Sequence, residues 1–176
     1  MELAEAKNIS IDHIDFYNVD IKAAFEIFKV GSQLITDAAT LKRVTKEIIE
    51  DYNKQNTRYL ELRSTPKAIG AIKTKEEYVE TVLEAIKEAS EEFKSIRVAF
   101  LISVNRTAEV ATAKEAVDLL VKFQERAAAE KTPPVVVGLE LSGDPRSGSF
   151  STFAGEFKRA QDAGFKVSLH CAETAE

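Results

Sequence analysis

His170 and Glu173 are the two residues whose types and spacing most directly suggest chemistry. They follow Lys166–Leu169, a run with the character of a buried β-strand. Parallel α/β proteins build their sites at the carboxyl ends of the strands. There a histidine can offer a nitrogen to a metal ion or carry a proton, and a glutamate on the next loop can act as an acid or base. A single histidine is also commonly structural, so both interpretations stay open at this point.

Polar clusters also follow three other predicted strands, at about residues 58–63, 96–104 and 135–141. They are Arg63–Lys67, Asn105 with Arg106, and Ser142–Asp144. Ser64, Thr65 and Lys67 can hold a phosphate through hydroxyls, backbone amides and an ammonium group, although ordinary loop chemistry explains them equally well. Gly143 either lets a flat ligand approach the backbone closely or is a turn glycine. The lone Cys171 is most simply a small buried hydrophobic residue.

Helical patterns separate these strands and must position the clusters. We expect a helix from Asp20 that ends at Gly31, a second capped by Thr36 or Asp37, and three more over about 74–93, 107–130 and 150–163. Strict alternation of strand and helix predicts the α/β class, with right-handed crossovers and a parallel sheet. We expect its strands to be neighbours in sequential order, with the fourth strand over 166–170. Residues 1–20 have no clear period and are expected to be irregular, with a short strand or extended arm over 9–16; residues 21–176 form one domain.

Composition narrows the function classes. The chain has 176 residues, 44% of them hydrophobic and 30% charged, and a net charge of −5. These values are typical of a soluble globular domain and argue against nucleic acid or an anionic membrane as the partner. One cysteine fits a reducing compartment, and neither a signal peptide nor a membrane-spanning run is evident. We therefore expect a cytoplasmic protein.

Three motifs in order resemble the adenosine deaminase superfamily. They are Tyr59–Lys67, Val137–Pro145 and Gly164–Glu173. The first is similar to the adenosine deaminase-like branch, which removes the amine from N6-methyl-AMP. The resemblance covers about Phe25 to the last residue. It implies a zinc-dependent (β/α)8 TIM barrel of the metal-dependent hydrolase type, of which this chain carries about strands two to five.

The resemblance also implies roles for particular residues. His170 resembles a zinc ligand, and Glu173 resembles the acid that protonates the purine ring. Gly143 resembles the backbone contact to the purine, and the segment Ser64, Thr65, Pro66 and Lys67 matches the one used for the nucleotide, on its phosphate side. The implied substrate is a purine nucleotide or nucleoside, the cofactor is one Zn²⁺, and the complete enzyme is expected to be a monomer.

Several positions depart from the family pattern. No His-x-His ends a first strand; the nearest string is His13–Asp15, which lacks the flanking pattern and is left unassigned. Ser32 and Asn105 stand where relatives of this branch would have His and Asp, which alters two expected substrate contacts. One zinc ligand cannot build a catalytic site, which needs three protein ligands. The hypotheses are therefore a purine deaminase represented by a fragment that lacks most zinc ligands, and a catalytically inactive truncated isoform that acts as an interaction piece.

Overall fold

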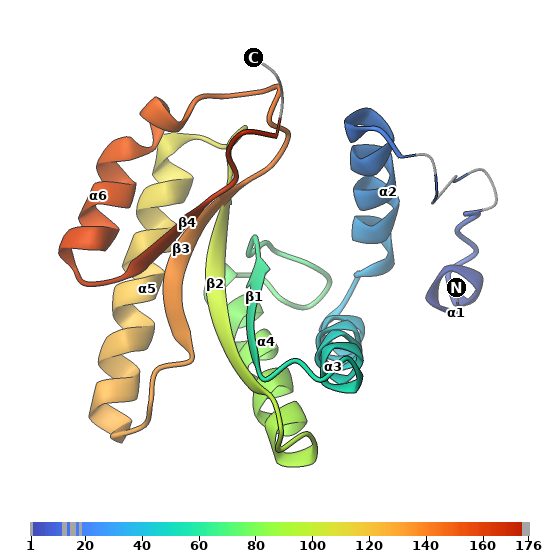
Figure 1. Cartoon of the computed structure of the whole chain (residues 1–176), viewed down its shortest axis with the longest axis horizontal. Helices are drawn as coiled ribbons and strands as arrows, with labels where there is room; N and C mark the ends of the chain where they lie inside the picture. Colours follow the sequence, from blue (N-terminus) through green and yellow to red (C-terminus); the bar gives the residue numbers. More distant parts are fainter. Residues whose placement is uncertain (1, 12–13, 15–16, 18, 174–176) are drawn as a thin grey trace.

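The computed structural model describes residues 2–11, 14, 17 and 19–173 (Figure 1). Its helices are α1 (Glu2–Ala6), α2 (Ile21–Leu34), α3 (Ala38–Lys54), α4 (Lys75–Glu92), α5 (Val110–Glu130) and α6 (Ala154–Asp162), with a short 3-10 helix η1 (Phe150–Thr152). Its strands are β1 (Tyr59–Ser64), β2 (Arg97–Asn105), β3 (Val136–Ser142) and β4 (Lys166–Leu169). Within these residues, no helix has the length and apolar character needed to cross a membrane.

The four strands form one parallel sheet in the order β1-β2-β3-β4. This confirms the predicted α/β class and the sequential order of the strands. Each predicted strand boundary is within one residue of the observed one. The register between β2 and β3 shifts once, where Phe100 pairs with Val136 and Leu101 pairs with Gly138. An extra residue of this kind bends a strand and increases its twist.

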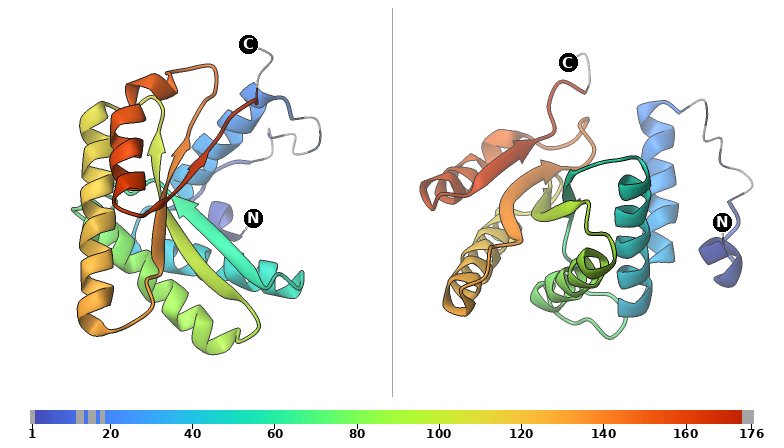
Figure 2. Two further views of the ribbon diagram at one scale, coloured as in Figure 1. Left: turned by 60° about the vertical axis from the view of Figure 1, so that its left-hand side comes forward. Right: turned by 60° about the horizontal axis from the view of Figure 1, so that its bottom comes forward.

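One face of the sheet is covered by α4, α5 and α6, which lie along it in all three views (Figures 1 and 2). Successive strand residues point to opposite faces, and Phe100, Ile102 and Val104 of β2 join Leu139 and Leu141 of β3 in the core on the helical side. Burying such side chains contributes about 1.5–3 kcal/mol each. This apolar layer fixes which residues must point to the opposite face.

The opposite face carries polar side chains near the strand ends. By the same alternation, Arg63, Ser103, Glu140 and His170 lie on this face, and contacts described below bring them together. The strands end at one edge of the sheet, and the described chain finishes at that edge beside β3 and β4 (Figure 1). The fold therefore gathers four sequence-distant polar segments at one place.

Helix starts and ends follow local chemistry, with a few corrections. Asp37 caps α3 by accepting a hydrogen bond from the Thr40 amide at 2.8 Å, as one of the two predicted alternatives. The prediction that Gly31 ends α2 is wrong: the helix continues to Leu34, since a glycine disfavours a helix interior by only about 1 kcal/mol. Helix α5 begins at Val110, later than the predicted position 107.

The first 20 residues differ in part from the irregular segment that we predicted. Residues Glu2–Ala6 form α1, because the sequence ELAEA consists of strong helix formers even though it is too short to show a period. The described residues 9–11 and 14 belong to no strand. His13 and Asp15 lie outside the described residues.

Candidate active site

His170 follows β4 directly and is held through four of its atoms. Its backbone amide donates to Leu141 O at 3.0 Å, and its carbonyl accepts a hydrogen bond from Arg106 Nη2 at 2.7 Å. Its ring nitrogen Nδ1 lies 3.1 Å from Leu141 O, and its Nε2 lies 3.0 Å from Arg63 Nη2. The half-buried ring is thus fixed in position by β3 on one side and by β1 on the other.

Glu140 is the buried charge beside this histidine. Its side chain is 0% exposed, and its Oε1 lies 2.5 Å from His170 Nδ1 and 3.5 Å from Arg63 Nε. Its Oε2 accepts a hydrogen bond from Ser103 Oγ at 2.6 Å. Ser103 Oγ also lies 2.6 Å from Ser142 Oγ; since the Ser103 hydrogen goes to a carboxylate, Ser142 must donate. We call Arg63, Ser103, Glu140, Ser142 and His170 the strand-end cluster.

The central member of this cluster was not predicted from the sequence. Glu140 was not among the predicted site residues, and Arg63, Arg106 and Ser142 were noted only as parts of polar clusters. The sequence does contain a signal that could have identified Glu140: it is the single charged residue in the otherwise apolar run Val135–Leu141. A buried carboxylate is costly unless it is paired and hydrogen-bonded. A lone acid in a buried strand therefore predicts partners on neighbouring strands.

Gly143 and Asn105 meet at the ends of β3 and β2. Gly143 has a φ of +103°, and a Cβ there would collide with Asn105 Oδ1. That oxygen accepts hydrogen bonds from the Thr107 amide at 2.9 Å and the Thr107 hydroxyl at 2.8 Å, so it is held in place. Only glycine fits both the backbone conformation and the space. The structure thus brings these two predicted site residues together.

The loop after Gly143 is fixed by its own ion pair. Arg146 hydrogen-bonds Asp144 through Nε at 2.8 Å and Nη2 at 2.5 Å. These bonds lower the pKa of Asp144 to about 2 and raise that of Arg146. The Asp144 carboxylate is therefore paired with Arg146 inside the loop itself.

Residues Ser64–Lys67 do not all face the strand-end cluster. Ser64 is the last residue of β1, and its Oγ lies 2.8 Å from Tyr78 Oη on α4, on the helical side. The pKa of Tyr78 lies above its ordinary value, because burial raises it by more than the bond to Ser64 lowers it. Thr65 is half-buried, Pro66 buried and Lys67 exposed. A contact between these residues and a phosphate stays a prediction, and Lys67 is the member whose charge is accessible.

Glu173 and Cys171 lie beyond β4 and are both exposed. Between them Ala172 adopts a φ of +56°, which turns the chain after the strand. The expectation that Cys171 is buried is wrong, because β4 is an edge strand and its end is covered on one side only. The acid role of Glu173 stays a prediction.

His170 fits a metal ion as one ligand, and the described residues do not complete a site. They contain no group of three or more His, Cys, Asp or Glu side chains that could hold a metal ion, and a catalytic zinc normally has three protein ligands. Nε2 of His170 faces only a hydrogen-bond donor, Arg63, so it can offer a lone pair. Glu140 Oε1 is instead turned to the other ring nitrogen.

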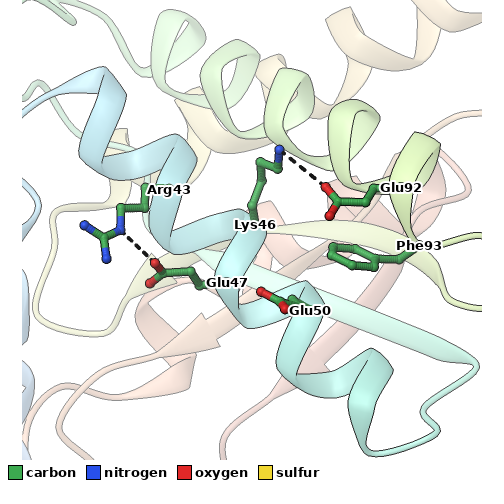
Figure 3. Close-up of a pocket in the computed structure, with 6 residues that line it drawn as sticks. All are labelled: Arg43, Lys46, Glu47, Glu50, Glu92 and Phe93. Atoms are coloured by element: carbon green, nitrogen blue, oxygen red, sulfur yellow. Dashed lines mark hydrogen bonds and ion pairs between the residues drawn. The ribbon is translucent and has the colours of Figure 1, made fainter. Parts of the chain in front are cut away.

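Two cavities of the helical layer are poorer candidates for the functional site than the strand-end cluster. One, of about 410 Å³, lies between α3 and α4 (Figure 3), and its charges pair with one another, as Arg43 with Glu47 and Lys46 with Glu92. The other, of about 670 Å³, is lined by α4, α5 and the amino-terminal ends of β2 and β3. Neither is lined by residues of the strand-end cluster.

The chain is similar to known proteins both in sequence and in structure. The chain is 37% identical to the adenosine deaminase-like protein of Drosophila melanogaster over 92% of its own length and 46% of that protein. It is 38% identical to N6-methyl-AMP deaminase of Mus musculus over 87% of its length and 41% of that protein. The crystal structure of Arabidopsis ADAL complexed with IMP superposes with a TM-score of 0.84 and 31% identity, over 99% of this chain and 54% of the other.

The chain spans about half the length of these relatives. The family model described as adenosine deaminase matches residues 4–176, a longer stretch than the motifs alone indicated. The four-stranded parallel sheet accordingly corresponds to part of a TIM barrel of that family. This chain belongs to the adenosine deaminase family.

Proposed function

We propose that this chain supplies the His170 half of the active site of a zinc-dependent hydrolytic deaminase that acts on a purine nucleotide. The observation that carries the proposal is the fixed ring of His170, whose Nε2 faces away from β3 at the carboxyl edge of the sheet. Zinc held there would make hydroxide available near neutral pH, since zinc lowers the pKa of a bound water to about 7. The relatives named N6-methyl-AMP deaminase and the relative that binds IMP support a nucleotide substrate.

The residues of this chain would then have distinct tasks. His170 holds the metal through Nε2, and Gly143 lets the flat purine lie against the backbone where any side chain would meet Asn105. Glu173, on the turn after β4, gives a proton to the ring nitrogen next to the carbon that carries the amine. The exposed Lys67 offers a charge to the phosphate.

The test uses a chimera, because the chain spans about half of its relatives. This chain replaces the aligned region of the Drosophila melanogaster relative, and zinc content and amine release from N6-methyl-AMP, AMP and adenosine are measured. We expect His170→Ala to lose zinc and activity, and Glu173→Gln to keep zinc and lose at least about 100-fold in kcat. The neighbouring Cys171→Ser should change neither.

The phosphate contact can be separated from the chemistry. Lys67→Met should lower kcat/KM for the nucleotides by about tenfold, or 1.4 kcal/mol, and leave adenosine unchanged. An equal loss for adenosine would remove Lys67 from the phosphate site.

A non-catalytic role is the second candidate. It is favoured by the absence of a three-ligand metal group among residues 2–11, 14, 17 and 19–173. A chimera that folds, as judged by circular dichroism, and neither retains zinc nor releases amine would support this role and contradict the deaminase proposal.

A further inference from the structure

We propose that Glu140 is a positioning residue: it fixes the neutral His170 ring in the form that carries its hydrogen on Nδ1, so that Nε2 keeps its lone pair, which faces Arg63 in this structure. The inference deepens the proposed function, since it rests on His170 as a ligand for its consequence. Its central observable, the tautomer of the ring, can be measured without any metal.

The contacts around the ring all require the same tautomer. Nδ1 faces two oxygens, Leu141 O at 3.1 Å and Glu140 Oε1 at 2.5 Å. A carbonyl can only accept a hydrogen bond, and an oxygen so close to a nitrogen is repelled unless a hydrogen lies between them. On the other side Nε2 faces Arg63, whose guanidinium can only donate. Nδ1 is therefore the donor and Nε2 the acceptor.

Glu140 is built to hold this position. It is fully buried, it comes from the middle of the sheet, and Ser103 holds its second oxygen at 2.6 Å. Arg63 Nε lies 3.5 Å from Oε1 and compensates the buried charge from the open side. Oε1 makes no hydrogen bond of regular geometry, and it lies nearer to His170 Nδ1, at 2.5 Å, than to Arg63 Nε, at 3.5 Å. Carboxylates that accept the second N–H of a metal-binding histidine fix its tautomer and raise its basicity as a ligand.

The competing explanation is that the Leu141 carbonyl alone sets the tautomer. Both oxygens lie near Nδ1, and the carbonyl has the more regular hydrogen-bond geometry. A substitution at Glu140 leaves the backbone carbonyl in place, so it distinguishes the two.

The experiment is nitrogen NMR of the whole chain with labelled histidine. The chain has 2 histidines, so a His13→Gln background leaves His170 as the single imidazole. Long-range proton–nitrogen correlations at about pH 8.5, well above the ordinary imidazole pKa of about 6.5, report which nitrogen is protonated. We expect the Nδ1–H form to exceed the other by at least tenfold. A dominant Nε2–H form would overturn the proposal.

Three variants separate the hydrogen bond from the charge and from folding. Glu140→Ala should lower the tautomer ratio at least fivefold. Glu140→Gln should preserve it, since the amide oxygen can face His170 while the amide nitrogen donates to Ser103. Glu61→Gln, an exposed carboxylate on the edge strand β1 that is bonded to Tyr59, is the control and should preserve it too.

Each result decides something. An unchanged ratio of the two tautomers in folded Glu140→Ala would show that the Leu141 carbonyl alone sets the tautomer, and it would contradict the proposal. If Glu140→Ala does not fold, Glu140→Leu takes its place, because it fills the space without an acceptor and should likewise lower the ratio; loss of the Nδ1–H form in the isosteric Glu140→Gln would also contradict the hydrogen-bond model. The ligand role is tested separately in the chimera, because the described residues of the isolated chain lack a complete ligand set: zinc retained by the His170→Ala chimera would count against the proposed function and leave the tautomer result standing.

Discussion

Charged side chains stabilise this chain in two contrasting regions. On the outer helices, pairs such as Lys42 with Glu84, Lys122 with Glu76 and Arg126 with Glu80 link α3, α4 and α5 across their exposed surfaces. In the strand-end cluster, Glu140 is 0% exposed and depends on Ser103, Arg63 and His170. Water solvates the members of the first group when a partner is lost, whereas no water reaches the buried Glu140 carboxylate to replace a lost partner.

The difference teaches how to weigh polar contacts of similar length. The Arg126–Glu80 contact measures 2.7 Å and the Ser103–Glu140 contact 2.6 Å, so distance does not separate them. Exposed pairs contribute about 0–1 kcal/mol, while a buried acceptor that loses its donor costs about 1–3 kcal/mol. Burial therefore decides which contact the fold depends on.

The largest effect should come from Ser103→Ala. This change removes the hydroxyl that donates to Glu140 Oε2 and leaves a buried carboxylate oxygen without its partner. We expect the free energy of unfolding, measured in urea, to fall by about 2 kcal/mol. Ser90→Ala is the matched control, because the Ser90 hydroxyl bonds Ile86 O on the exposed side of α4, and it should change stability by less than about 0.5 kcal/mol. Equal effects of the two substitutions would contradict the contrast.

A second prediction concerns the loop that follows Ser142 at the end of β3. Gly143→Ala places a Cβ at a φ of +103° and against Asn105, so we expect a loss of about 1–2 kcal/mol. Gly155 in α6 has no atom within 4 Å of an added Cβ, and Gly155→Ala should stabilise the chain by about 0.5–1 kcal/mol. Thermal unfolding of both variants should therefore move in opposite directions. A stabilised Gly143→Ala would show that the loop is not constrained.

The helical region was largely predictable from the sequence, because its signals are local. The predicted start of a helix at about residue 74 is correct, and Thr74 and Glu77 form a full capping box there. The strands were readable as apolar runs between helical patterns, and their order followed from the short crossovers. The predicted helix end at Gly31 was wrong, because a helix that other residues stabilise tolerates one glycine in its interior.

The strand-end cluster was predictable only in part, because its contacts join residues far apart in the chain. His170 lies 107 positions from Arg63 and 29 from Leu141, and no periodicity reports such pairs. Ser64 shows the same limit: its position after an apolar run suggested a ligand contact, yet strand alternation turns it to Tyr78. Which face a strand's last residue takes depends on the register with its neighbours.

A smaller effect is expected for an exposed ion pair. A double-mutant cycle with Arg126→Met and Glu80→Gln should give a coupling free energy of about 0.5 kcal/mol. At about 1 M salt the coupling should fall toward zero, since the screening length is then about 3 Å. The destabilisation by Ser103→Ala should not change with salt, because Glu140 is shielded from solvent. A salt-independent coupling between Arg126 and Glu80 would mean that this pair is less accessible than its roughly 40% exposed side chains indicate.

The smallest effect should be seen at Asp37, an exposed carboxylate that nevertheless has fixed partners. Bonds from the Thr40 backbone amide first, and then from the Thr40 and Thr36 side chains, lower its pKa from 3.8 to about 2. Because the folded pKa lies below the unfolded one, the Asp37 contribution is complete above about pH 4 and is lost as the pH falls through 3.8 toward about 2. The variant Asp37→Asn keeps a side chain that caps the helix, since asparagine and aspartate are comparable in this position. It should therefore lie slightly below the parent in stability at about pH 7, and the gap should close by about pH 2, as urea unfolding across this range can measure. A gap that stays constant down to about pH 2 would show that the carboxylate charge contributes nothing at this cap.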